Sequence, residues 1–180
     1  MIEPRILLSH SQIDLIIRRF ALQIAENHGN MDGCALLGMQ PRGVELSRRL
    51  YEVVKTMYPS CGLRYGELDN SFFRDDIGRG DLIVPSPNRI DFSTENLHII
   101  LVDDVLYTGR SVRAGLDALM NYGRPASVEL MVLIDRRYNR ELPIAADYSG
   151  TVVDSRSTGE HVKVEWMEND NKVWLLSKKE

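Results

Sequence analysis

The chain has 180 residues, of which 43% are hydrophobic and 27% charged, and its formal net charge is −4. This composition is typical of a soluble globular protein with one sizeable core, and it excludes a disordered chain. The acidic balance gives no overall signal for nucleic-acid binding, although it does not exclude a local basic patch. No apolar run is long enough to span a bilayer and the first residues lack the pattern of a signal peptide, so we expect a cytoplasmic protein.

Helical and strand patterns alternate in the first half of the chain. A first helix is predicted from a Ser11 cap to about His28, because apolar residues recur on one helical face and a glycine supplies the stop. The apolar run CALLGM, residues 34–39, predicts a buried strand, and QPRG then predicts a turn. Residues 44–57 show the spacing of a second helix, and residues 62–69 predict a further strand.

The second half opens with a long irregular stretch, residues 70–97, which is polar and contains Gly and Pro. A stretch of that length in a compact domain predicts a functional arm or hairpin. The alternation then resumes with an apolar strand from His98, a helix after YTGRS and the apolar strand SVELMVLID. Two or three shorter strand patterns follow, with a hairpin turn predicted at residues 169–171. Strands that alternate with helices predict a single α/β domain, residues 1–180, built on a doubly wound, mainly parallel sheet flanked by helices.

Two adjacent carboxylates, Asp103 and Asp104, end the apolar strand of HIILVDDVLYTGRS and precede a helix. In open α/β sheets, ligands bind at the carboxyl ends of the strands, which is where this pair is expected. The helix N-terminus offers free N–H groups and a positive dipole end, Gly109 allows close backbone approach, and Thr108 and Ser111 add hydroxyl donors, so the loop predicts a phosphate cradle. Carboxylates bind hydroxyl groups or a divalent metal. A ribose 5-phosphate therefore matches both the pair and the cradle.

The same stretch carries a family resemblance. IILVDDVLYTGRS, residues 99–111, resembles the phosphoribosyl-pyrophosphate (PRPP) binding motif of the type I phosphoribosyltransferases, and with VRAGLDAL after it resembles the PyrR branch of that superfamily. The segments that also resemble PyrR sequences are LLGMQPRGVELSRRL, GELDNSFFRDD, NYGRPASVELMVLIDR and RELPIAADYSG, so the resemblance covers most of the chain. It implies a type I phosphoribosyltransferase-like fold with a flexible β-arm at about residues 70–97 and a small hood, with C-terminal strands, at about residues 136–180.

The resemblance also implies a role for each matched position. The PRPP-binding residues would be Asp103, Asp104, Val105, Leu106, Tyr107, Thr108, Gly109, Arg110 and Ser111, with the two aspartates on the ribose hydroxyls and the last five residues on the 5-phosphate. The pyrophosphate loop would be Gln40, Pro41, Arg42 and Gly43, the flexible loop would open with Arg74, Asp75 and Asp76, and the base side would hold Asp135 and Arg136. The catalytic residues would be Asp103, Asp104, Arg42 and Arg74. Mg²⁺ would arrive bound to PRPP, with Asp103 and Asp104 as the candidate protein ligands.

The reaction that the resemblance implies joins uracil to PRPP and releases UMP and pyrophosphate, with Mg²⁺ required. Its transition state is similar to an oxocarbenium ion. Catalysis would therefore consist mainly of positioning and of neutralising the departing pyrophosphate with Mg²⁺, Arg42 and Arg74. The arm would fold over the closed site and exclude water from the reactive sugar. No nucleophilic side chain is required.

Two other functions remain open. One is an RNA-binding attenuator that senses UMP or UTP in the same pocket and binds the leader of a messenger RNA. Its candidate basic patch consists of Arg18, Arg19, Arg136, Arg137 and Arg140. The other is a purine phosphoribosyltransferase, which is disfavoured because Arg136 stands where a lysine is expected in that branch, and the two side chains are not interchangeable. The resemblance further implies a homodimer or a larger homo-oligomer and no membrane partner.

The sequence departs from the PyrR pattern at two places in the predicted site. Pro41 replaces the usual threonine of the pyrophosphate loop, and Arg137-Tyr138-Asn139 replaces Gly-His in the hood. Before a proline, the preference for a trans peptide bond shrinks to about 0.5–1 kcal/mol. We therefore hypothesise a cis bond between Gln40 and Pro41 in at least the ligand-bound state, against the commoner alternative of a trans proline that starts the next helix.

Overall fold

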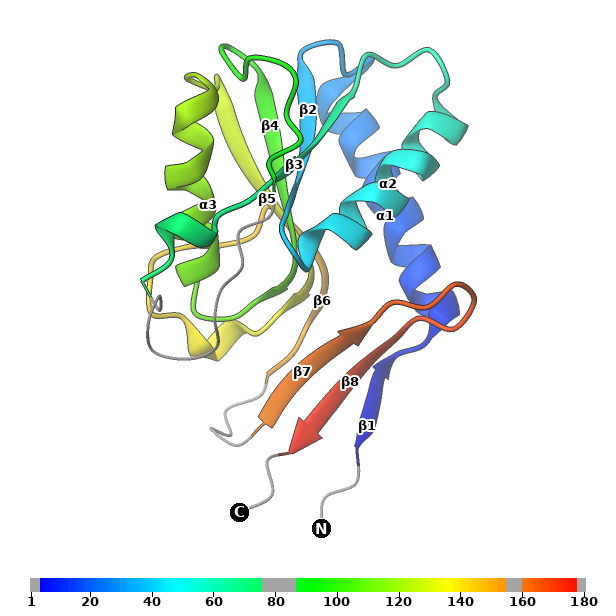
Figure 1. Cartoon of the computed structure of the whole chain (residues 1–180). Helices are drawn as coiled ribbons and strands as arrows, with labels where there is room; N and C mark the ends of the chain where they lie inside the picture. The colour runs from blue at the N-terminus through cyan, green and yellow to red at the C-terminus, as the bar shows by residue number, and fades with distance from the viewer. Residues whose placement is uncertain (1–3, 76–86, 155–159, 178–180) are drawn as a thin grey trace.

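A parallel sheet of five strands forms the centre of the protein (Figure 1). The computed structural model describes residues 4–75, 87–154 and 160–177. The strand order is β3-β2-β4-β5-β6, and every neighbouring pair is parallel. The strands are β2 (Cys34–Met39), β3 (Arg64–Leu68), β4 (His98–Leu106), β5 (Ser127–Asp135) and β6 (Tyr148–Val152). The prediction of a mainly parallel α/β sheet is confirmed.

Three α-helices cover the two faces of this sheet. α1 (His10–His28) and α2 (Gly43–Met57) pack on one face, and α3 (Arg110–Leu119) packs on the other (Figure 1). Successive strand residues point to opposite faces. Leu36 therefore lies in the core beneath α1 and α2, whereas Leu37 lies in the core beneath α3. Because both faces are buried, the central strands read as continuous apolar runs in the sequence.

The first helix begins two residues before the predicted start. Ser9, and not Ser11, is the N-cap, because the Ser9 backbone N–H donates a hydrogen bond to the side-chain oxygen of Gln12 at 2.9 Å. The prediction of Ser11 as the cap is therefore wrong. This segment has several polar residues, and only the fold determines which of them caps the free N–H groups at the start of the helix.

A second, antiparallel sheet brings the two ends of the chain together. Its strands, in the order β1-β8-β7, are β1 (Arg5–Leu8), β7 (Glu160–Glu165) and β8 (Lys172–Ser177). The β7-β8 hairpin matches the predicted turn at residues 169–171, but β1 is not among the predicted strands. Leu8, Val162 and Val173 are buried in the same core as α1. This sheet lies beyond the carboxyl ends of the parallel strands (Figure 1). It joins the N-terminal strand β1 to the C-terminal hairpin, whereas β6, which falls within the predicted hood, belongs to the parallel sheet.

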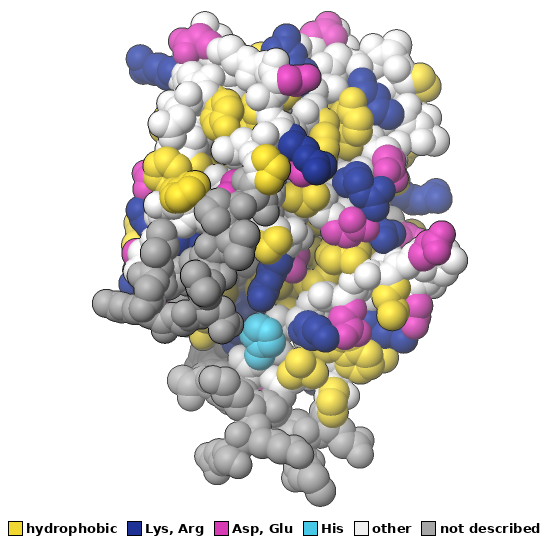
Figure 2. Space-filling model, in the orientation of Figure 1, with side chains coloured by type: hydrophobic (Ala, Val, Ile, Leu, Met, Phe, Trp, Pro, Cys, Tyr) yellow, Lys and Arg dark blue, Asp and Glu magenta, His cyan; other side chains and the backbone are white. Residues whose placement is uncertain are grey.

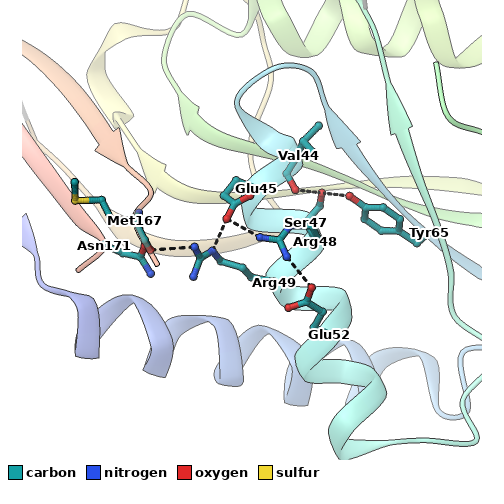
Figure 3. A network of polar contacts seen from close by, with 9 residues as sticks. All are labelled: Val44, Glu45, Ser47, Arg48, Arg49, Glu52, Tyr65, Met167 and Asn171. Carbon is teal, nitrogen blue, oxygen red and sulfur yellow. Dashed lines mark hydrogen bonds and ion pairs between the residues drawn. The ribbon is translucent and has the colours of Figure 1, made fainter. Parts of the chain in front are cut away.

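Arg49 fastens α2 to the second sheet. Its Nη2 donates to the Met167 carbonyl oxygen at 3.1 Å, and its Nε donates to Glu45 at 2.8 Å (Figure 3). Glu45 also accepts a hydrogen bond from Arg48 at 2.8 Å. The Arg49 guanidinium lies 5.3 Å from the centre of the Trp166 ring. The start of α2, which follows the predicted pyrophosphate loop, is thereby held against the hood.

The described part of the predicted arm has little regular structure. It contains the short 3-10 helix η1 (Ser71–Phe73) and an isolated antiparallel bridge between Glu67 and Arg89. Residues 76–86, which include Asp76, lie outside the described residues. The other 3-10 helices are η2 (Met120–Tyr122) and η3 (Arg137–Asn139). None of the described helices is long and apolar enough to cross a membrane.

Candidate active site

Asp103 and Asp104 lie on β4, the middle strand of the parallel sheet, near its carboxyl end. The sequence suggested that the pair ends the strand. The strand in fact continues to Leu106, so the pair lies within its last residues. Only 8% of the surface of Asp103 and 5% of that of Asp104 is exposed. Asp103 Oδ1 accepts a hydrogen bond from the Asp104 backbone N–H at 2.9 Å. Two buried carboxylates side by side are costly unless positive charge or hydroxyl donors reach them.

The charges of two predicted arginines act on the predicted acidic pair. Burial raises the pKa of both carboxyl groups above their usual range, and for Asp103 the neighbouring Asp104 charge adds to this. The positive charge of Arg42 acts in the opposite direction on the pKa of both carboxyl groups, and that of Arg74 does so on Asp103. Arg42 comes from the loop after β2 and Arg74 from the start of the arm. Two cations from separate segments therefore act on the acidic pair through their charge.

The loop after β4 leads into the N-terminus of α3. Gly109 caps this helix with a φ of 91°, in the left-handed region that favours glycine. A Cβ atom at Gly109 would lie 3.2 Å from Cδ1 of Ile144. The backbone N–H of Arg110 donates to Thr108 Oγ1 at 3.3 Å. The first turn of an α-helix has N–H groups without helical partners, which is the arrangement that binds a phosphate.

The loop after β2 approaches the acidic pair closely. A Cβ atom at Gly43 would lie 2.1 Å from the Val102 carbonyl oxygen and 3.0 Å from the Asp103 Cα atom, so glycine is required there. The peptide bond between Gln40 and Pro41 is cis, as hypothesised. The predicted pyrophosphate loop thus lies directly against the strand that carries the carboxylates.

The start of the arm contacts α3. Arg110 Nη1 lies 2.5 Å from the carboxylate of Asp75, and this hydrogen bond holds the pKa of Asp75 below its usual range. Arg113 Nη2 donates to the Phe73 carbonyl oxygen at 2.6 Å. The described start of the arm is therefore held beside the predicted phosphate loop, while Asp76 lies outside the described residues.

The predicted base-side pair adjoins the same loop. Asp135 is the last residue of β5, the strand next to β4, and the Arg136 backbone N–H donates to the Leu106 carbonyl oxygen at 2.9 Å. Only 3% of Arg136 is exposed, and its guanidinium carbon lies 4.3 Å from the centre of the Tyr107 ring. The fold thus joins the predicted base side to the predicted 5-phosphate loop.

Two of the five arginines considered as a basic patch, Arg136 and Arg140, are turned inward. Arg136 is buried, and Arg140 donates to the Asp135 carboxylate and to four backbone carbonyl oxygens. Arg19 donates to two carbonyl oxygens of β6, each at 2.8 Å. On the face seen in Figure 2, cationic and anionic side chains are interspersed. Charged residues counted along a sequence do not reveal which of them the fold turns inward.

Known proteins resemble the chain over most of its length. The family model described as phosphoribosyl transferase domain matches residues 5–169. A protein named Bifunctional protein PyrR from Caldicellulosiruptor bescii is 43% identical over 168 residues, which cover 91% of this chain and 90% of that protein. The protein of the same name from Streptococcus mutans is 42% identical with the same coverage. The chain belongs to the phosphoribosyl transferase family, in its PyrR branch.

Solved phosphoribosyltransferases share the fold of this chain. A hypoxanthine phosphoribosyltransferase from Staphylococcus aureus superposes with a TM-score of 0.66 at 19% identity, covering 83% of this chain and 77% of the other. A hypoxanthine-guanine phosphoribosyltransferase from Bacillus anthracis gives a TM-score of 0.66 at 16% identity, covering 85% and 86%. At these identities the likeness shows the fold alone, so it does not favour a purine over a pyrimidine substrate. The family model and the relatives described above show that the chain is a phosphoribosyltransferase.

The acidic pair suits an Mg²⁺ ion that arrives with its substrate. Within the described residues, no group of three or more His, Cys, Asp or Glu side chains could hold a metal ion by itself. Mg²⁺ is commonly bound by one or two carboxylates together with substrate phosphates. Asp103 and Asp104 supply such carboxylates, and their raised pKa values mean that added positive charge would stabilise their ionised forms.

Two contacts around the site could not be predicted from the sequence. Asn70, which is 2% exposed, donates from Nδ2 to the Ser111 carbonyl oxygen at 2.9 Å and so ties the arm to α3. Arg140 points inward, although the sequence suggested a surface position. Asn70 and Ser111 are 41 positions apart in the sequence, and Arg140 is 33 positions from Tyr107, one of its partners. The available signal was their place in GELDNSFFRDD and RELPIAADYSG, which resemble family segments.

Proposed function

We propose that the protein transfers the phosphoribosyl group of PRPP to uracil, giving UMP and pyrophosphate. The proposal rests chiefly on the buried Asp103–Asp104 pair, which lies among the charges of Arg42 and Arg74 and beside a loop at a helix N-terminus. A ligand with vicinal hydroxyls, a phosphate and a pyrophosphate matches all of these groups at once. Uracil as the acceptor is supported by the resemblance to PyrR sequences and by Arg136 in place of the lysine expected for purines.

Each proposed role follows from the chemistry of its residues. Asp103 and Asp104 accept hydrogen bonds from the ribose hydroxyls, and the loop of residues 107–111 donates to the 5-phosphate. Arg42 and Arg74 bind the pyrophosphate leaving group. As the bond between C1′ and the pyrophosphate oxygen breaks, positive charge develops on the sugar ring, and the carboxylates stabilise it. The bond from C1′ to N1 of uracil then forms, and the N1 proton passes to the released pyrophosphate or to water. No nucleophilic side chain is needed, because the site holds both reactants in place.

Mg²⁺ and the arm complete the proposed site. When bound with PRPP, Mg²⁺ supplies positive charge that offsets the charge of the pyrophosphate. Asp103 and Asp104 would be its protein contacts. The arm that begins at Arg74, Asp75 and Asp76 would close over the bound substrates and exclude water, which otherwise hydrolyses a sugar cation.

The product of the reaction tests the proposal directly. Purified protein is incubated with Mg²⁺ and PRPP and with each of uracil, hypoxanthine, guanine and orotate in turn. We expect UMP from uracil and no nucleotide from the other three bases. A preparation of the Asp103→Asn Asp104→Asn variant, made in the same way, controls for contaminating transferases. Nucleotide formed from hypoxanthine or guanine would favour the purine alternative, and no product from any base would contradict the proposal.

We propose, as a second function, that UMP or UTP bound in this site increases the affinity of the protein for a messenger RNA leader. The observation in its favour is that relatives 42–43% identical to the chain carry the name Bifunctional protein PyrR. The coupling would amount to about 1–3 kcal/mol, the usual range for two linked ligands. Filter binding of the leader at physiological salt, with and without UMP, measures it. Weak, sequence-indifferent binding that UMP does not change would contradict this function and leave the transferase.

We further propose that the single domain, residues 1–180, acts in the cytoplasm as a homodimer or a larger homo-oligomer. Light scattering at two protein concentrations measures the molar mass in solution. A monomer at both concentrations would contradict this assembly.

A further inference from the structure

Arg140 lies behind the loop that follows β4, and only 18% of its side chain is exposed. Its Nη1 donates to the Tyr107 carbonyl oxygen at 2.6 Å and lies 3.1 Å and 3.2 Å from the carbonyl oxygens of Arg136 and Leu106. Its Nε donates to the Ile144 carbonyl oxygen at 2.9 Å. One side chain thereby contacts backbone carbonyl groups in three segments: the end of β4 with the loop after it, the predicted base side, and the segment that contains Ile144.

The residues around Arg140 complete this contact. Its Nη2 pairs with the carboxylate of Asp135, whose side chain is 16% exposed, so the buried guanidinium charge is neutralised. The backbone N–H groups of Glu141 and Leu142 donate to the Thr108 carbonyl oxygen at 3.0 Å and 3.3 Å. Three consecutive carbonyl groups, from the last residue of β4 into the loop, therefore all point towards the segment that begins at Arg140.

The direction of these carbonyl groups determines where the loop's N–H groups point. In a planar trans peptide unit the C=O and the following N–H point in opposite directions. Because the carbonyl groups of Tyr107 and Thr108 face the Arg140 segment, the N–H groups of Thr108 and Gly109 face away from it. We propose that Arg140 is a positioning residue, which holds these peptide units so that their N–H groups face the 5-phosphate of PRPP or UMP. The inference rests on the proposed PRPP site.

The chemistry of arginine explains why this position needs a guanidinium. Arginine presents five N–H donors in a rigid planar fork, whereas lysine presents three donors at a single point. A lysine at position 140 retains a positive charge for Asp135 but does not reach the separate carbonyl groups of Tyr107, Leu106 and Ile144. The Arg140→Lys variant therefore separates the positioning role from simple charge neutralisation. Because the Arg136 carbonyl is held as well, the same fork also links the base side to the phosphate loop.

Steady-state kinetics and calorimetry on Arg140→Lys test the proposal. We expect the KM for PRPP and the Kd for UMP to rise about tenfold to a hundredfold, the cost of a displaced binding group, with the Kd for inorganic pyrophosphate little changed. Arg19→Lys is the matched control, because Arg19 also holds two backbone carbonyl groups, at 2.8 Å each, but on β6. A variant that had only lost stability would show less active enzyme with an unchanged KM for PRPP. Wild-type values in Arg140→Lys would overturn the inference.

Hydrogen exchange in the wild-type protein supplies a second test that needs no variant. The N–H groups of Thr108 and Gly109 should exchange rapidly without ligand and become protected when UMP binds. Amides already protected without ligand would contradict the proposed orientation. A wild-type protein that neither formed product nor bound UMP would contradict the proposed function instead, so the two failures are distinguishable.

Discussion

Buried and half-buried polar side chains lie at both ends of the parallel sheet, but the fold satisfies them differently. At the amino end, Glu129 near the start of β5 accepts a hydrogen bond from the Tyr148 hydroxyl at 2.7 Å and lies 2.9 Å from Nε2 of His28. Asn27 donates to the same hydroxyl at 2.9 Å. Burial, followed by the hydrogen bond to Glu129, raises the pKa of Tyr148 to about 12, so the hydroxyl keeps its proton and remains a donor. This network is complete within the protein.

At the carboxyl end, Asp103 and Asp104 accept hydrogen bonds from the backbone, and Arg42 and Arg74 act on them through charge. Burial nevertheless leaves the pKa of both carboxyl groups raised. The buried acids at this end therefore still favour added hydroxyl donors or positive charge. Comparison of the two ends teaches that burial of a polar group does not by itself indicate function. An unbalanced charge among buried groups is the better sign of a ligand site.

The largest effect should come from removing the charges at the carboxyl end. The Asp103→Asn Asp104→Asn variant loses the groups proposed to bind the ribose and to stabilise charge in the transition state. We expect kcat/KM for PRPP to fall by about 10²–10³-fold, the usual range for loss of such a group. Circular dichroism should show an unchanged fold. Kinetics equal to those of the wild type would contradict a functional role for the acidic pair, and the two ends of the sheet would then not differ in function.

The same variant should be more stable than the wild type without ligand. A carboxyl group whose pKa is raised by folding stabilises the protein below its unfolded pKa and loses that contribution as pH rises through its folded pKa. Asp103 and Asp104 therefore lower stability as pH rises above the ordinary carboxyl range. We expect the double variant to melt at least about 2–4 °C above the wild type at slightly alkaline pH, which corresponds to 1 kcal/mol or more.

Thermal melts across a pH series measure this difference. It should shrink as the pH falls, because both aspartates then become protonated in the folded wild type. A double variant that melted below the wild type at alkaline pH would show that the ionised pair stabilises the fold, contrary to its raised pKa values.

The smallest effect should come from the amino end. Tyr148→Phe removes the hydrogen bond to Glu129, while His28 remains beside that carboxylate. It also removes the hydrogen bond from Asn27, but Asn27 is exposed and its amide can bond to water instead. We expect a loss of about 1 kcal/mol in the free energy of unfolding, the typical net value of one hydrogen bond, measured by urea denaturation. The KM for PRPP and kcat should stay at wild-type values. A change in either constant would mean that the amino-end network also acts on the site.

Local patterns in the sequence determined most of the elements that surround the site. The apolar run that contains Asp103 and Asp104 predicted a strand, and Gly109 followed by a helical spacing predicted the loop and α3. These features depend on residues close together in the chain, whose backbone preferences and periodicity act locally. The family resemblance added the pyrophosphate loop and the start of the arm for the same reason, because each is a short contiguous motif.

Only the tertiary structure decided which distant residues share a surface. β1 exists because it pairs with β8, and a four-residue strand has too few residues to be recognised alone. Arg140 and Arg136 have the same local signature as surface arginines, yet the fold turns one towards backbone carbonyl groups and buries the other against Tyr107. Such outcomes depend on long-range contacts, and the free energy of burying a charge is set by the partners that the fold brings to it.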